Sequence, residues 1–60
     1  MVHTFTFLKE YLDITITDFE NYELDVMKIE DDNEFVNVTV KGSSENVKTM
    51  IRFFNGTEYI

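Results

Sequence analysis

The segment Phe35–Lys41 constrains the fold more than any other part of the sequence, because its side chains alternate. Val36, Val38 and Val40 share one phase, and the residues between and after them are polar. A period of two indicates a β-strand with one apolar and one polar face. Such a strand needs neighbouring strands and a layer that covers its apolar face, so the pattern predicts a covered antiparallel sheet.

The composition also favours strands. No alanine occurs, whereas Val, Ile and Thr supply 18 of the 60 residues and Phe and Tyr supply nine more. β-Branched and aromatic side chains fit a pleated, half-buried surface, and the best helix former is absent. At 43% hydrophobic residues, the chain has too much apolar character for a disordered protein. We therefore expect a folded, β-rich domain.

Residues 11–17 show the same alternation, with Leu12, Ile14 and Ile16 in one phase. This pattern predicts a strand, because a period of two is typical of a half-buried strand. The aspartate and asparagine in residues 18–21 predict the turn that ends it, since both side chains bond to their own backbone.

A further strand is predicted at residues 22–30, where Leu24 and Val26 share the inward phase. Lys28 then falls in register with Val26, which predicts either a β-bulge or a strand covered on both faces. Residues 31–34 are all turn formers or acids and predict a hairpin loop to the next strand.

Residues 1–10 admit two interpretations. Phe5 and Phe7 alternate with threonine, which favours a strand, whereas Phe5, Leu8 and Leu12 would also share one face of a helix. We expect a strand here.

The period changes after Gly42. Apolar residues now recur at the spacing of a helix face: Val47, Met50, Ile51 and Phe54. Ser43 or Ser44 can serve as the N-cap, and Asn55-Gly56 as the C-terminal stop. The same Asn-Gly pair is a hairpin signal, so an all-β fold with a C-terminal hairpin is the alternative.

Together these patterns predict an α+β fold for a single domain of residues 1–60. The expected architecture is a small antiparallel β-meander of three to four strands, with one C-terminal helix packed on one face.

The size and the lack of cysteine narrow the possible functions. A domain of this length buries only about 60% of its unfolded surface, which leaves no room for a deep substrate cavity. Without cysteine there is neither a disulfide nor a thiolate metal cage, so oligomerisation is the remaining means of stabilisation. No targeting segment or long apolar stretch is recognisable, and we expect a cytoplasmic protein with no membrane contact.

The charge is confined to one segment. The net charge is -7, and residues 18–34 alone carry eight acids against Lys28, while the rest of the chain is nearly neutral. Like charges closer than a Debye length of about 8 Å repel, and a thin core has little stability to offset this repulsion. The acids are therefore interpreted either as a solvated face that maintains solubility or as a docking surface for a basic partner.

The candidate partner-binding residues are these acids and three neighbouring aromatic residues that would anchor the contact: Asp18, Glu20, Glu23, Asp25, Glu30, Asp31, Asp32, Glu34, Phe19, Tyr22 and Phe35. On a strand at 22–30, Glu23 and Asp25 would project from one face about 6.6 Å apart. Asp13 on a neighbouring strand would extend this array in two dimensions.

Several kinds of chemistry are not expected. His3 is the only histidine, and the serines are better explained as helix caps than as nucleophiles. The two glycines form no phosphate-binding loop, and the acidic stretches lack the Gly and Glu positions of an EF-hand. We therefore expect no catalysis, no cofactor and no resident metal. Direct nucleic-acid binding is also disfavoured, because a polyanion would repel this chain.

In size and charge the chain resembles the small acidic inhibitors that phages encode against host nucleic-acid enzymes, DNA mimics among them. This resemblance implies an inhibitor that occupies the basic, nucleic-acid-binding groove of a partner protein. The alternative is a self-associating structural domain, a homodimer that buries the surplus apolar residues Met27, Ile29, Phe53, Tyr59 and Ile60.

Overall fold

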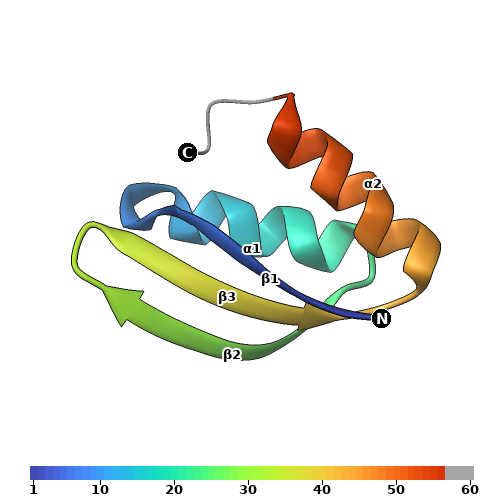
Figure 1. Cartoon of the computed structure of the whole chain (residues 1–60), viewed down its shortest axis with the longest axis horizontal. Helices are drawn as coiled ribbons and strands as arrows, with labels where there is room; N and C mark the ends of the chain where they lie inside the picture. Colours follow the sequence, from blue (N-terminus) through green and yellow to red (C-terminus); the bar gives the residue numbers. More distant parts are fainter. Residues whose placement is uncertain (57–60) are drawn as a thin grey trace.

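The computed structural model describes residues 1–56 of the chain and shows an α+β fold, as the sequence predicts (Figure 1). In chain order the elements are β1 (Val2–Leu8), the 3-10 turn η1 (Lys9–Tyr11), α1 (Leu12–Asn21), β2 (Asp25–Asp32), β3 (Phe35–Lys41) and α2 (Ser44–Asn55). Tyr59 and Ile60, which the sequence flagged as surplus apolar residues, lie outside the described residues.

The three strands form one antiparallel sheet in the order β1-β3-β2. The central strand β3 has the bounds that its alternation predicts. β1 and β2 run in the same direction on either side of it, and the connection that contains α1 crosses from one edge of the sheet to the other (Figure 1). The predicted meander is therefore wrong in strand order, because it would place the strand at 22–30 in the middle of the sheet.

One face of the sheet is apolar and is covered by both helices. Phe5 lies opposite Val38 and Phe7 opposite Val36 in the register of β1 and β3, and all four side chains are buried. Residues directly opposite each other in an antiparallel pair share a face, so these residues form the floor of the core.

Four phenylalanines join the sheet to the helices. Phe5 of β1 packs on Phe54 of α2 with a ring-centroid distance of 4.5 Å and on Phe19 of α1 at 5.3 Å. Phe7 contacts the same two rings at 5.7 Å and 6.3 Å. Such aromatic pairs contribute about 0.5–1.5 kcal/mol each beyond the area that they bury.

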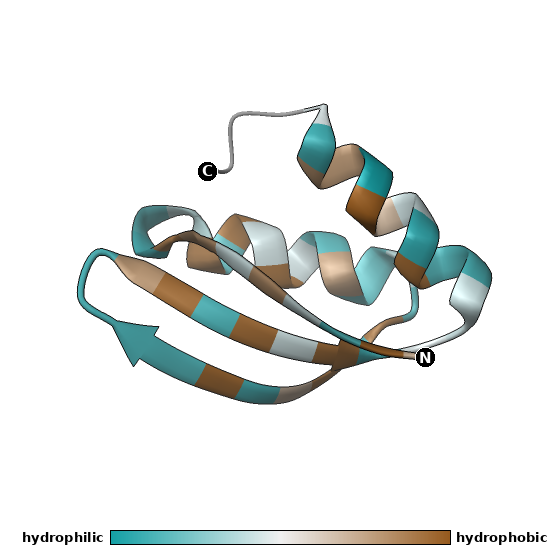
Figure 2. Cartoon of the chain, in the orientation of Figure 1, coloured by the Kyte–Doolittle hydropathy of each residue, from teal (hydrophilic) through white to brown (hydrophobic). Residues whose placement is uncertain are grey.

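The predicted C-terminal helix is confirmed as α2, and the hairpin alternative is wrong. Ser43 is the N-cap, and its Oγ accepts a hydrogen bond from the Asn46 amide at 3.1 Å. Val47, Met50 and Phe54 are buried on the inner face. Figure 2 shows hydrophobic segments alternating with hydrophilic ones along α2.

The strand predicted at 11–17 is wrong, because this segment begins in η1 and continues as α1. Ile14 is 60% exposed, whereas Thr15 and Phe19 are fully buried. In a helix, Leu12, Thr15 and Phe19 share one face. This face packs against the core, where Thr15 and Phe19 are fully buried and Leu12 is partly buried, and this burial favours the helix. The turn predicted at 18–21 is likewise the last turn of α1.

The predicted bulge is confirmed in β2. The register with β3 shifts between Val26 and Lys28, so Met27 is the extra residue. The strand itself lies at Asp25–Asp32 instead of 22–30, and Leu24 is buried ahead of it. The predicted N-terminal strand is also confirmed, as β1.

Candidate partner-binding surface

β2 is an edge strand, and it is the most exposed element of the sheet. Its inner side pairs with β3, and within residues 1–56 no strand pairs with its outer side. Seven of its eight residues are exposed, and Val26 is half-buried. The helices therefore cover the centre of the sheet and leave this strand outside the core.

The side chains of β2 place acids on both faces of the sheet. Glu30 lies opposite Asn37 and Asp32 opposite Phe35, so both acids point to the open face, away from the helices. Asp31 lies opposite the buried Val36 and therefore points to the helix side. The strand is thus negative on either face at its turn end, and Figure 2 shows this end as hydrophilic.

Outside β2, the open face is polar at its centre, and Lys41 is the charged residue that the described strands place on it. The hydroxyls of Thr4 and Thr39 lie 2.9 Å apart in a hydrogen bond, and Thr6 Oγ1 donates to Asn37 Oδ1 at 2.6 Å. These pairs link β1 to β3 across the centre of the face. The negative charge of the open face is therefore concentrated along one edge, β2.

Two lysines neutralise part of this edge. Lys9 Nζ lies 2.6 Å from Asp31 Oδ1, and Lys28 Nζ lies 3.6 Å from Glu30 Oε1. All four side chains are largely exposed, so each ion pair contributes only about 0.2–1 kcal/mol. Within residues 1–56, Asp25 and Asp32 have no ion-pair partner.

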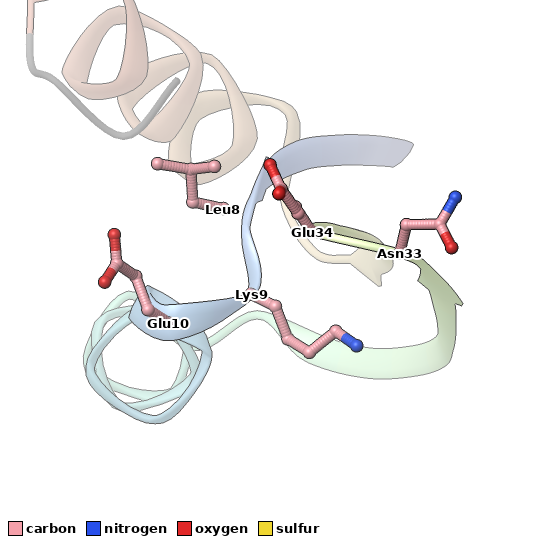
Figure 3. A pocket seen from close by; sticks show the side chains of 5 residues that line it. All are labelled: Leu8, Lys9, Glu10, Asn33 and Glu34. Atoms are coloured by element: carbon pink, nitrogen blue, oxygen red, sulfur yellow. The ribbon is translucent and has the colours of Figure 1, made fainter.

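A shallow hollow of about 330 Å³ adjoins the turn end of β2 (Figure 3). It is lined by Leu8, Lys9, Glu10, Asn33 and Glu34. The Lys9 amide donates to the Glu34 carbonyl at 2.8 Å, which holds the end of β1 against the β2–β3 turn. In Figure 3 the Lys9 side chain points away from Leu8 and Glu10, toward the ribbon of β2. Glu10, which is not among the residues predicted from the sequence, lines the same hollow as Glu34.

The remaining predicted acids gather at the opposite end of β2. Asp18 and Glu20 lie in the last turn of α1, and Glu23 lies in the short loop before Asp25. The expected array of Glu23 and Asp25 on one strand face is wrong, because Glu23 precedes the strand and has a φ of 56°. Asp13 is in the first turn of α1 and not on a neighbouring strand.

The acids thus form two groups at the two ends of β2. The strand-start group comprises Asp18, Glu20, Glu23 and Asp25, and the turn group comprises Glu30, Asp31, Asp32 and Glu34. Asp25 and Glu30 lie five positions apart along the strand, about 17 Å at the usual rise. Lys28 and the bulged Met27 lie between the groups.

Each acidic group has one exposed aromatic neighbour. Tyr22, the C-cap of α1, is 40% exposed beside the strand-start group, and Phe35 is 37% exposed beside the turn group. Phe19 was predicted as a third anchor, and this is wrong, because its ring is fully buried against Phe5, Phe7 and Phe54.

The described part of the chain brings no three His, Cys, Asp or Glu side chains together as a metal site. Among residues 1–56 no helix is long and apolar enough to cross a membrane. Comparisons of the chain with family models, curated proteins and solved structures give no match.

Proposed function

We propose that this chain is an acidic protein-binding module that inhibits a nucleic-acid-processing protein by occupying its basic groove. The observation that carries the proposal is the exposed edge strand β2 with an acidic group at either end. A groove that holds a phosphate backbone attracts ordered negative charge, and electrostatic attraction of this kind accelerates association.

The placement of the acids supports a role in binding over one in solubility alone. Asp18 and Glu20 lie at the C-terminal end of α1, where the helix dipole is negative, and the last turn itself contains no basic residue. An acid in the last turn costs about 0.3–1 kcal/mol relative to a neutral residue. A solubility face needs acids only on exposed positions, and α1 offers such positions nearer its N-terminus, where acids stabilise the helix.

Tyr22 and Phe35 supply the anchors that charge alone does not give. Binding energy is concentrated in a few aromatic and arginine contacts, while acids at the rim mainly set the association rate. Because each acidic group has one half-exposed aromatic side chain, two anchor points fit the two ends of β2. We expect each anchor to contribute about 2 kcal/mol or more to affinity.

In this groove the chain would mimic DNA. It would act in the cytoplasm, where a phage inhibitor meets host enzymes. The partner is a basic protein; the chain itself contacts neither nucleic acid nor membrane, and it catalyses no reaction. At a net charge of -7, repulsion by nucleic acid supports this division of roles.

Capture from a bacterial lysate at low and high salt tests the proposal. The tagged chain is compared with Glu30→Gln/Asp32→Asn on β2 and with Thr4→Lys/Thr6→Lys on β1, because both double variants raise the net charge equally. We expect a nucleic-acid-binding protein to be recovered at low salt, to be displaced by DNA, and to be lost preferentially with the β2 variant. Equal loss with both variants would show that only net charge matters.

Self-association is the second candidate function, and the exposed apolar residues of β2 favour it. Met27 is 60% and Ile29 is 49% exposed, and a dimer through this edge would bury both. Light scattering after size exclusion distinguishes the two functions. A dimer with no captured partner supports the structural role, whereas a monomer that captures a basic protein supports the inhibitor.

A further inference from the structure

The outer edge of β2 has a property that charge alone does not describe. An edge strand presents a row of unpaired N–H and C=O groups, which can pair with a strand of another chain. Within residues 1–56 no element pairs with this edge, and its side chains are exposed along almost its whole length. Backbone pairing is therefore available here in addition to electrostatic attraction.

The bulge limits the part of the edge that can accept a strand. Met27 interrupts the register with β3, and a bulge bends its strand and ends regular pairing locally. From Lys28 to Asp32 the register with β3 is continuous. The segment that is straight enough to pair with a further strand is thus residues 28–32.

The side chains of this segment specify the occupant. Glu30 and Asp32 project from the open face about 6.6 Å apart, with Lys28 at the next position on that face, so the two acids match two basic residues at alternate positions of an added strand. Ile29, 49% exposed, projects from the other face and matches an aliphatic residue between them. A second copy of the chain, paired antiparallel about Glu30, would set Glu30 opposite Glu30 and only Lys28 opposite Asp32, so it offers these acids fewer basic residues than a basic strand does.

We propose that residues 28–32 bind an extended segment of the partner by strand addition, and that this segment alternates Lys or Arg with aliphatic residues. The inference rests on the proposed function, since it names how a basic partner is held. The backbone hydrogen bonds require the partner's segment to be extended, and Glu30 and Asp32 require it to be positively charged.

Binding of two synthetic peptides, followed by amide NMR of the labelled full chain, tests the inference. One is a short, end-capped peptide of alternating lysine and valine. The other has the same sequence with alternate backbone amides methylated, so that it keeps its charge but cannot donate along one edge. We expect the first to shift the amides of residues 28–32 and to protect from exchange those alternate amides that point away from β3, and the second to bind at least tenfold more weakly.

Two protein variants locate the site. Glu30→Lys removes an acid from the pairing segment, and Glu34→Lys makes the same charge change in the adjoining turn. We expect the Glu30 variant to lose binding of the alternating peptide and the Glu34 variant to retain most of it. Equal losses, or amide shifts centred on β1, would overturn the inference.

The outcomes separate the inference from the proposed function. If both peptides bind equally and their affinities fall with salt, strand addition is wrong and the acidic binding surface stands. If neither peptide binds at low salt, the acidic edge attracts no basic chain, and both are wrong.

Discussion

The two edge strands of one sheet differ in almost every respect. β1 contributes Phe5 and Phe7 to the core and contains no acid, whereas β2 contributes one half-buried valine and contains four acids. Both strands pair with β3 over a similar length. The difference shows that strand pairing and core packing contribute separately to holding a strand in the sheet. β1 is held by both, whereas β2 is held mainly by its pairing with β3. The outward side chains of β2 are therefore free for binding.

Removing a phenylalanine from β1 is the strongest test of the view that β1 packs the core and β2 is held mainly by strand pairing. We expect Phe7→Ala to lower the free energy of unfolding by about 3–5 kcal/mol, because the ring is fully buried between Phe19 and Phe54. In a domain this small, that loss unfolds most of the population. Met27→Ala on β2 is the control and should change stability by less than about 0.5 kcal/mol. Urea denaturation followed by circular dichroism measures both, and comparable losses would contradict this view.

Thr15 on α1 offers a gain of stability in the core. Its hydroxyl is buried and has no hydrogen-bond partner within the described residues, and an unsatisfied buried polar group costs about 1–3 kcal/mol. We expect Thr15→Val to raise the free energy of unfolding by about 1–2 kcal/mol, since valine has the same shape. The exposed Thr17, which donates to the Asp13 carbonyl, is the matched control. A loss of stability in the Thr15 variant would show that its hydroxyl is satisfied in solution.

Substitutions of Glu23 test whether the backbone of the loop before β2 is strained. The φ of Glu23, 56°, lies in the left-handed region, which costs a non-glycine residue about 1–2 kcal/mol. We expect Glu23→Gly to stabilise the domain by about 1 kcal/mol, and Glu20→Gly, within α1, to destabilise it by a similar amount. Glu23→Gln keeps the backbone strain and removes the charge. If it stabilises as much as glycine does, repulsion rather than strain is the cause.

The smallest effect concerns the turn group itself. Within residues 1–56, Asp32 and Glu34 have no ion-pair partner, and they lie close in sequence to other acids. We expect Asp32→Asn/Glu34→Gln to stabilise the domain by less than about 1 kcal/mol at low salt, with the gain disappearing at high salt. Lys9→Met removes the ion pair with Asp31 and should act in the opposite direction. A salt-independent change would rule out repulsion as the cause.

The elements with clear periodicity could be predicted from the sequence. The alternating valines of β3 and the helical spacing of α2 match their positions in the structure, and the phase slip at Lys28 located the bulge. In each case the periodicity and the burial agree. The bounds of these elements follow from local chemistry, such as the Ser43 cap.

The segment 11–17 could not be predicted correctly from alternation alone. Its β-branched residues fit a strand, but packing against the phenylalanine core overrides this propensity and selects a helix. The available signal was the spacing of Leu12, Ile16 and Phe19, which share a helical face if Phe19 is interpreted as core. Treating Phe19 as an exposed anchor hid that spacing.

The candidate surface was predicted in composition but not in geometry. The eight acids chosen from the sequence lie in β2, in the turn that follows it, or in the end of α1 and the loop that precede it. Their separation into two groups depends on α1 and on the position of β2 at the sheet edge, and both are products of long-range packing. A meander with the strand at 22–30 in its centre would have no free edge there.

Amide NMR of the labelled chain bound to the protein that it captures tests most directly whether β2 is the binding surface. We expect binding to shift the amides of β2 and of its two acidic groups, and those of β1 to stay in place. Shifts concentrated on β1 or on α2, with β2 unchanged, would contradict this expectation.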